Sequence, residues 1–262
     1  AGGAAFTALV LSLLLGPFTI SALRKFNAAA PSRLKGLVPD QLLDARKDRT
    51  PSMGGLLILF AIVVASLLWG APNNPLLPAF LVTLLTLGLV GFLDDYAKIA
   101  HGRRDGISAR IKLTCQIVIG LAAVAYLFAQ SSDATLNMWE FMVPFRKLPL
   151  LSGWPGAAVS LCIGVLAVVG ASNAVNLTDG KDGLAVGCTI SCALTYAVFA
   201  YLCGHRLFAG HLQIPAIPGC SEVAVFAAAI VGAGIGFLWY NCHPAAMFMG
   251  DTGSLALGGS IG

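Results

Sequence analysis

The sequence predicts an all-α fold: a polytopic bundle of transmembrane helices that forms a single integral membrane domain over residues 1–262. Hydrophobic residues make up 57% of the chain and charged residues only 11%. A soluble domain carries about 25% charged residues, which it needs to cover its core. The mean hydropathy is +0.83, and long apolar runs follow one another along the chain. Both observations predict a membrane protein, because an apolar surface of this extent is stable in contact with lipid.

About eight apolar runs come close to the 20 or so residues that cross a bilayer. Asp94 and Asp95 end the third run, and the fifth run is rich in glycine, which lets membrane helices approach closely. Because the chain stops inside the last run, we expect further helices beyond it. In order, the predicted helices are 4–23, 53–69, 76–93, 112–129, 155–172, 184–203, 222–240 and one that begins near Leu255.

The distribution of Lys and Arg predicts the orientation of the chain in the membrane. Thirteen of the 16 basic residues lie in the loops after the first, third and fifth predicted helices. Cytoplasmic loops carry such an excess, so these loops are expected in the cytoplasm and the N-terminus outside. The net charge is +4. Because the basic residues lie in loops beside the apolar runs, they suit an anionic lipid surface, and no nucleic-acid partner is expected. The seven cysteines form no CxxC pair, so neither a zinc site nor a disulfide framework is expected.

Four polar clusters fall on the side predicted to be cytoplasmic. In chain order they are 47–55, 94–98, 173–183 and 241–254. In the second, adjacent Asp94 and Asp95 repel each other at a membrane edge, and either a divalent metal or Lys98 would relieve that repulsion. The alternative is a solvated helix end with an i,i+4 ion pair from Asp94 to Lys98.

The third cluster places polar groups at Asn173, Asn176, Asp179 and Asp182. Four residues at this spacing drift around an α-helix and do not share one face, whereas a helix break near Gly180 and Gly183 would let them turn toward one ligand. Amide and carboxylate groups suit a base or a sugar. An ordinary polar turn is the alternative.

The fourth cluster contains Asn241, Phe248 and Asp251. Asp251 stands among small residues and could bind Mg²⁺, which prefers oxygen ligands and bridges to phosphates. It could also cap the helix that follows. Phe248 could stack on a base or pack at the membrane interface. Five carboxylates with lysines on one face favour phosphoryl transfer, which needs a metal and positioned cations.

Across these clusters the sequence resembles the polyprenyl-phosphate N-acetylhexosamine-1-phosphate transferases, in particular the members that act in peptidoglycan assembly. The matching stretches occur in the family's order and span nearly the whole chain: 50–55, 91–98, 173–185 and 244–259. The resemblance implies a ten-helix membrane protein of the bacterial inner membrane with a cytoplasmic active site, which forms a homodimer. It also implies Mg²⁺-dependent transfer of phospho-MurNAc-pentapeptide from UDP-MurNAc-pentapeptide to undecaprenyl phosphate, giving lipid I and UMP.

By the same resemblance, Asp251 binds Mg²⁺, and Asp94 and Asp95 lie at the reacting phosphates, Asp94 engaging the lipid phosphate. The residues expected to bind substrate are Lys47, Lys98, Asn173, Asn176, Asp179, Asp182, Asn241 and Phe248, the last against the uracil. The chain departs from the family pattern at Arg49 and Lys181, which add positive charge. The family's His-rich motif would follow residue 262.

Two alternatives are left open. The first is a related enzyme that transfers GlcNAc-1-phosphate from UDP-GlcNAc to undecaprenyl phosphate. The second is a secondary transporter whose carboxylates bind ions or protons. Transporter sites lie near the bilayer midplane on broken helices, whereas these carboxylates are predicted at the cytoplasmic edge.

Overall fold

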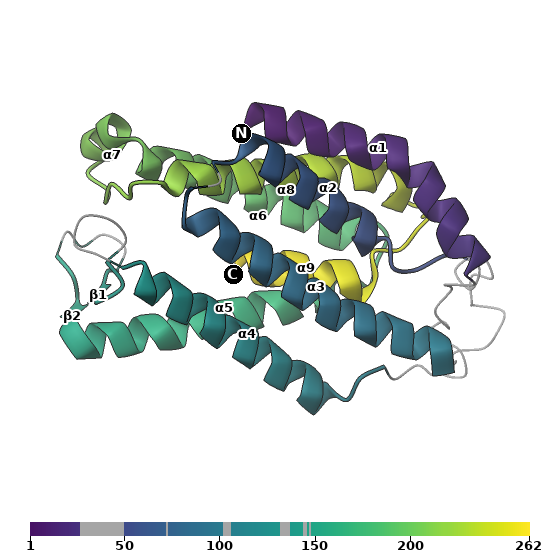
Figure 1. The fold of residues 1–262 in the computed structure, drawn as a ribbon, viewed down its shortest axis with the longest axis horizontal. Coiled ribbons are helices and arrows are strands. Elements are labelled where there is room, and N and C mark those ends of the chain that lie inside the picture. The colour runs from purple at the N-terminus through teal and green to yellow at the C-terminus, as the bar shows by residue number, and fades with distance from the viewer. Residues whose placement is uncertain (27–49, 72, 102–105, 132–136, 144–145, 147) are drawn as a thin grey trace.

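The structure, a computed structural model, describes residues 1–26, 50–71, 73–101, 106–131, 137–143, 146 and 148–262. Within these residues the chain folds into helices and one small two-stranded sheet (Figure 1). Strands β1 (Glu140–Phe141) and β2 (Leu151–Ser152) pair antiparallel. The helices are α1 (Gly2–Lys25), α2 (Gly55–Trp69), α3 (Leu76–His101), α4 (Ala109–Ala129), α5 (Gly153–Thr178), α6 (Leu184–Gly204), α7 (Arg206–Leu212), α8 (Cys220–Asn241) and α9 (Gly250–Ile261).

All the predicted apolar runs form helices, which confirms the all-α class. Helices α3 and α5 continue beyond their apolar runs, to His101 and Thr178, because a helix backbone pairs internally whatever its side chains are. The sequence predicted neither α7 nor the sheet. Helix α7 has 7 residues and each strand has 2, too few for a hydrophobic period to be recognised.

The interior of the bundle is built around α8 and α9. Helix α8 packs along α1 and α6, and α9 packs against α3 and α5 (Figure 1). Small buried residues of α8, such as Ala229 and Gly232, make the first contact close. A Cβ atom at Gly232 would overlap the backbone carbonyl of Ala5 in α1. Close backbone approach through small residues is the usual means of packing between membrane helices.

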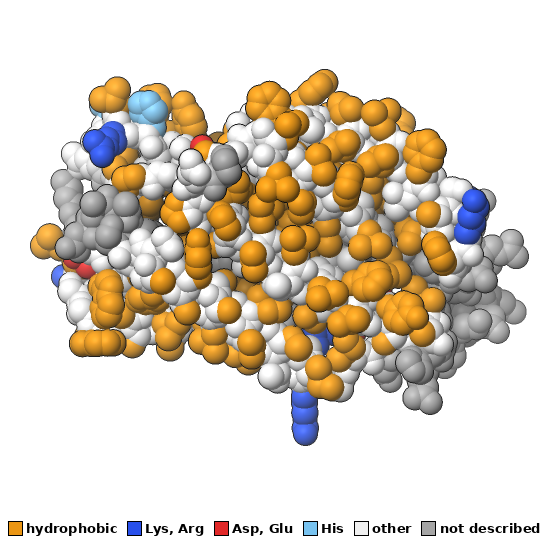
Figure 2. Space-filling model, viewed as in Figure 1, with side chains coloured by type: hydrophobic (Ala, Val, Ile, Leu, Met, Phe, Trp, Pro, Cys, Tyr) orange, Lys and Arg blue, Asp and Glu red, His pale blue; other side chains and the backbone are white. Residues whose placement is uncertain are grey.

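The outer surface is apolar. Figure 2 shows hydrophobic side chains over most of the visible face, and large residues such as Phe18, Leu166 and Trp239 are 73%, 68% and 76% exposed. A protein in water would bury them. Six of the described helices are long and apolar enough to cross a membrane, while α2 and α9 are shorter. The chain is therefore a multi-pass membrane protein.

The polar clusters that the structure describes gather at one end of the bundle. The C-terminal ends of α1 and α3 and the N-terminal ends of α2 and α9 lie at the right of Figure 1, opposite α7 and the sheet. The loop between α5 and α6 joins this end, since the Gly183 N–H donates to Asn241 Oδ1 at 3.0 Å. Lys47 and Arg49 lie outside the described residues.

Candidate active site

Three buried carboxylates meet where α3 passes the start of α9. Asp94 and Asp95 come from α3, and Asp251 comes from the first turn of α9. The three residues are 1 to 4% exposed, and one oxygen from each carboxylate lies within 4.8 Å of the other two. We call these three residues the acidic cluster. Buried carboxylates at this spacing require compensating positive charge.

Two lysines supply that charge within the chain. Lys98 Nζ lies 2.6 Å from Asp94 Oδ2 and 3.0 Å from Asp251 Oδ2. Lys112, from the first turn of α4, places its Nζ 3.1 Å from Asp94 Oδ1 and 2.7 Å from Asp251 Oδ2. The predicted i,i+4 pair between Asp94 and Lys98 is therefore present, but as part of a buried network that joins three helices.

Asp95 has a different set of partners from Asp94. Its Oδ1 accepts a hydrogen bond from the backbone N–H of Asp251 at 3.1 Å. Its Oδ2 accepts from the backbone N–H and the hydroxyl of Thr252, at 2.9 and 2.7 Å. The first N–H groups of a helix have no partners within it and carry partial positive charge. A carboxylate of α3 thus caps α9 from outside.

The alternative role considered for Asp251, as the N-cap of its own helix, is wrong. The N-cap position is Met249, and Asp251 lies in the first helical turn with its carboxylate on the two lysines. Gly250 enters the helix with a φ of 76°, a left-handed conformation that glycine adopts without strain. This turn directs Asp251 toward α3.

Close backbone packing holds the start of α9 in place. The N–H of Gly54 donates to the Phe248 carbonyl and the N–H of Gly55 to the Met249 carbonyl, both at 2.8 Å. A Cβ atom at Gly91 would overlap the carbonyl of Asp251. A Cβ atom at Gly55 would likewise overlap the backbone of Gly253, so glycine is needed at both positions where the chain passes the start of α9.

Of the two asparagines on α5, only Asn176 reaches the acidic cluster. Its Nδ2 donates to Asp251 Oδ1 at 2.9 Å and to Ser254 Oγ at 2.8 Å. Asn173 lies nearly one turn earlier, and its Nδ2 donates to Gln116 Oε1 at 2.8 Å. Gln116 in turn is tied to Ser172 of α5 at 3.1 Å. Asn173 thus belongs to a contact between α4 and α5.

The remaining polar residues of the third cluster adjoin the segment between α8 and α9. The predicted helix break is confirmed: α5 ends at Thr178, and Gly183 precedes α6 with a φ of 77°. Asp179 is the C-cap of α5. Asp182 Oδ2 lies 3.0 Å from Nδ1 of the exposed His243. This group lies beside the entry to α9, through the pairing of Asp182 with His243.

Asn241 and Phe248 frame the segment that leads into α9. Asn241 is 2% exposed, and its amide accepts from the Gly183 N–H and donates to the Met247 carbonyl. Both ends of this amide are therefore engaged within the chain. Phe248 is half-buried and its backbone pairs with Pro51 and Gly54.

The donor chemistry of the acidic cluster fits Mg²⁺. Carboxylate oxygens are the ligands that this ion prefers, and each oxygen has two lone pairs, so those that already accept hydrogen bonds can still coordinate. Three carboxylates against two ammonium groups leave one negative charge in the described site. A divalent cation would reverse that sign and allow phosphate groups to approach.

Sequence reasoning did not select Lys112, Thr252 or Ser254 as site residues. Lys112 was counted only among the basic loop residues that set the orientation. Its position at the start of the predicted apolar helix 112–129 was a usable signal, since a lysine inside a membrane helix needs a partner. Thr252 and Ser254 act through contacts with other helices, for which one sequence contains no signal.

Known proteins resemble this chain over most of its length. Residues 77–262 match the profile of glycosyl transferase family 4. The phospho-N-acetylmuramoyl-pentapeptide-transferase of Methylacidiphilum infernorum is 45% identical over 99% of this chain and 70% of its own length. The proteins of the same name from Syntrophus aciditrophicus and Maridesulfovibrio salexigens are 46% and 43% identical, each over 99% of this chain and 69% of its own length.

Proposed function

This chain belongs to glycosyl transferase family 4, and we propose that it transfers phospho-MurNAc-pentapeptide from UDP-MurNAc-pentapeptide to undecaprenyl phosphate. The products are lipid I, a precursor of peptidoglycan, and UMP. In the net step, the bond between the sugar-bearing phosphorus and the UMP oxygen breaks, and its electron pair leaves with UMP. A bond forms between that phosphorus and an oxygen of the lipid phosphate. The names of the bacterial relatives support this donor.

The observation that carries the proposal is the buried acidic cluster with its two lysines. Both substrates are anionic, so the site must neutralise phosphate charge before they can meet. Lys98 and Lys112 each lie within 3.1 Å of at least two carboxylates, and either can turn toward a phosphate oxygen. Asp251, beside Asp94 and Asp95, would hold Mg²⁺, which when bound would neutralise phosphate charge and orient the diphosphate.

The two aspartates of α3 are assigned different roles. Asp94 is bound to Lys112 and accepts from the Ile107 N–H at 2.9 Å, at the junction of α3 and α4. We assign it to the lipid phosphate, which it can orient or deprotonate. Asp95 caps α9, so we assign it the positioning of Asp251.

The donor would lie over the segments that surround α9. Asn176, Asp179, Asp182 and Phe248 offer amide, carboxylate and aromatic groups to the nucleotide and the sugar, with Lys47 as a further contact. Because the Asn173 amide donates to Gln116, its part would be to hold α5 against α4. Because the Asn241 amide is engaged within the chain, its part would be to hold the loop between α5 and α6 against the entry to α9.

The location follows from the charges of the loops. Basic residues are concentrated in the loops predicted at the end of the bundle that carries the acidic cluster, as in cytoplasmic loops. The protein would therefore lie in the bacterial inner membrane with its site open to the cytoplasm, where the nucleotide donor is made. We also propose that the protein forms a homodimer.

A transfer assay with the full-length protein in detergent tests this function. Radiolabelled UDP-MurNAc-pentapeptide and UDP-GlcNAc would be offered separately with undecaprenyl phosphate, with Mg²⁺ or with EDTA. We expect a lipid product from the first donor only, and only with Mg²⁺. Product from UDP-GlcNAc alone would favour the related GlcNAc-1-phosphate transferase. No product from either donor would contradict the proposal.

Secondary transport gains no support from the site. Asp251 belongs to the first turn of α9, and the cluster gathers with the polar loops. A transporter site would be expected nearer the midplane. Uptake by proteoliposomes without lipid transfer would be the result that revives it.

A further inference from the structure

A second set of hydrogen bonds joins three helices of the bundle one turn deeper than the acidic cluster. Gln116 Nε2 of α4 donates to Ser172 Oγ of α5 at 3.1 Å, and Ser172 Oγ donates to the Leu255 carbonyl of α9 at 3.0 Å. All three residues are fully buried. We call this chain of two hydrogen bonds the polar tie. No step of the proposed function uses it.

Each residue of the polar tie lies four positions from a residue of the active site on the same helix. The pairs are Gln116 and Lys112 on α4, Ser172 and Asn176 on α5, and Leu255 and Asp251 on α9. Residues four apart lie on the same face of an α-helix, one above the other, and about 6 Å apart along its axis at 1.5 Å per residue. The polar tie therefore repeats, one turn away, the connections that the site makes.

The same three helices meet at Asp251. Its Oδ2 accepts from Lys112 Nζ at 2.7 Å, and its Oδ1 accepts from Asn176 Nδ2 at 2.9 Å. These contacts cannot all persist during the proposed reaction, because Lys112 turns toward a phosphate and Asp251 would bind Mg²⁺. The polar tie contacts no substrate, so it can hold α4 and α5 beside α9 while the contacts above it exchange.

Close backbone packing makes the polar tie possible. A Cβ atom at Gly258 of α9 would overlap the Ala171 carbonyl and the Cα atom of Ser172 on α5. At that separation a serine hydroxyl reaches a carbonyl of the neighbouring helix. Packing of small residues sets how closely two membrane helices approach. A hydrogen bond also opposes sliding and rotation, because it weakens steeply away from its preferred angle.

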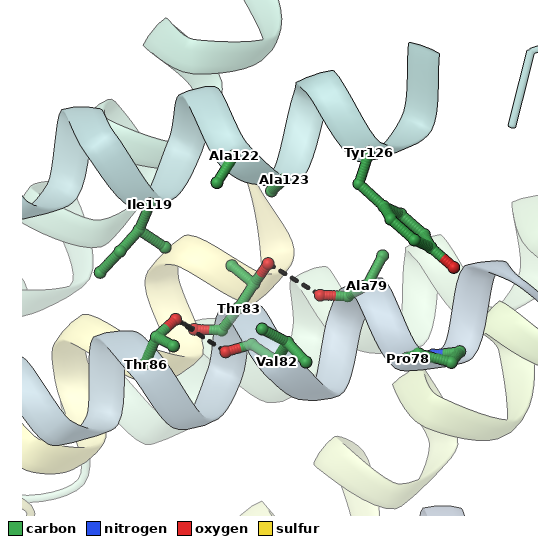
Figure 3. A pocket seen from close by; sticks show the side chains of 9 residues that line it. All are labelled: Pro78, Ala79, Val82, Thr83, Thr86, Ile119, Ala122, Ala123 and Tyr126. Carbon is green, nitrogen blue, oxygen red and sulfur yellow. Dashed lines mark hydrogen bonds between the residues drawn. The ribbon is translucent and has the colours of Figure 1, made fainter. Parts of the chain in front are cut away.

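Beyond Lys112, α4 separates from α3. A groove of about 280 Å³ lies between the two helices, and Figure 3 shows the small and apolar side chains that line most of it. The hydroxyls of Thr83 and Thr86 in this groove bond to carbonyls of their own helix, α3. Gln116, on the side of α4 that contacts α5, supplies the polar contact that these threonines do not.

We propose that Gln116 and Ser172 are positioning residues. The polar tie holds the side chains of Lys112 and Asn176 in line with Asp251. The inference rests on the proposed function, which supplies the phosphates and the Mg²⁺ to which these side chains turn. Without the tie, α4 and α5 can shift against α9, and a misplacement of about 1 Å at a reacting group lowers the rate by up to about 100-fold.

Ser172→Ala removes both hydrogen bonds of the polar tie. We expect kcat for transfer to fall by about tenfold or more, and the unfolding temperature in detergent to fall because the buried Gln116 amide loses a partner. KM for each substrate should change less than kcat, because the binding groups remain and only their alignment for the reaction is lost. Ser260→Ala is the matched control, since it removes a buried hydroxyl of α9 that bonds to carbonyls of its own helix. Equal kcat values in the two variants would overturn the inference.

A double variant separates positioning from structural support. In Gln116→Leu combined with Ser172→Ala, both side chains of the tie become apolar, so the unfolding temperature should recover toward that of the parent. The directional hydrogen bonds are still missing, so kcat should stay low. Recovery of kcat together with stability would show a purely structural role and overturn the inference. A double variant that does not fold would overturn it as well, because the pair would then be needed for the bundle itself.

Thermal stabilisation by Mg²⁺ gives a readout that does not depend on transfer. We expect the Mg²⁺ concentration for half of the stabilisation to rise about tenfold in the double variant, the loss typical of removing a group that orients a metal ligand. It should stay at the parent value in Ser260→Ala. A raised Mg²⁺ requirement in a protein whose parent transfers neither donor would reject the proposed reaction and keep the positioning role. If the double variant responds to Mg²⁺ as the parent does, Asp251 has not moved and the inference is overturned.

Discussion

Asp95 of α3 holds Thr252 of α9 by two hydrogen bonds to one carboxylate oxygen, from the backbone N–H at 2.9 Å and from the hydroxyl at 2.7 Å. The residues are 157 positions apart in the chain. This contact fixes the start of α9, and with it Asp251, against the aspartates of α3. Several expected effects of substitution follow from it and from the ion pairs beside it.

Asp95→Asn should impair both stability and transfer. The amide retains one acceptor oxygen where the carboxylate has two, so one N–H at the buried start of α9 loses its partner, at a cost of about 1–3 kcal/mol. Thermal unfolding in detergent and transfer rates would be measured together. Thr252→Val is the graded comparison, because it removes only the hydroxyl bond. An Asp95→Asn protein as stable as the parent but inactive would argue against a positioning role.

Lys112→Met should lower kcat by about 100-fold or more, the loss typical of removing one group that stabilises developing charge. The reason is that Lys112 bridges Asp94 and Asp251. Lys181→Met removes the same charge from an exposed position and serves as the control, measured in the same transfer assay. Equal activity of the two variants would remove Lys112 from the mechanism.

Asp251→Asn should abolish Mg²⁺-dependent turnover and also Mg²⁺-dependent thermal stabilisation. A ligand that binds only the folded state stabilises it by RT ln(1 + [L]/Kd), so a lost metal site is visible without any substrate. Unfolding temperatures would be recorded over a Mg²⁺ titration. Glu140→Gln, in the sheet at the opposite end, should respond to Mg²⁺ as the parent does. Retained stabilisation in Asp251→Asn would place the metal elsewhere.

Asn176→Ala and Asn173→Ala form a matched pair on α5. Removal of Asn176 leaves Asp251 Oδ1 and Ser254 Oγ without that donor, so the transfer rate should fall by about tenfold or more. Removal of Asn173 affects the contact with Gln116 and should change stability more than rate. Transfer kinetics and unfolding temperatures would be measured for both variants. A larger loss of transfer rate in Asn173→Ala than in Asn176→Ala would contradict the placement of Asn176 at the acidic cluster.

Gly91→Ala should displace α9, since its Cβ would overlap the Asp251 carbonyl. We expect a loss of stability and of activity in the assays above. In contrast, Gly187→Ala on α6 meets nothing within 4 Å and should stabilise the helix by up to about 1 kcal/mol. A Gly91→Ala protein with full activity would show that the start of α9 tolerates movement.

Much of the architecture was predictable from the sequence. Hydropathy along the chain identified every helix of membrane length among the described residues, because membrane insertion depends on apolar runs that lie within one segment. The spacing of polar clusters at alternate connections placed them at one end, which the structure confirms for the described residues. Asp94, Asp95 and Asp251 were selected for the same reason: isolated carboxylates at apolar helix ends are costly without a partner.

Contacts between helices that are distant in the chain were decided only by the tertiary structure. It showed that Asp95 caps α9, that Lys112 completes the charge network and that Asn176, not Asn173, reaches the acidic cluster. Hydropathy and helical period report what a segment needs from its surroundings, a lipid or a counter-charge. Which partner meets that need depends on how the helices pack, and packing joins residues that lie up to 157 positions apart in the sequence.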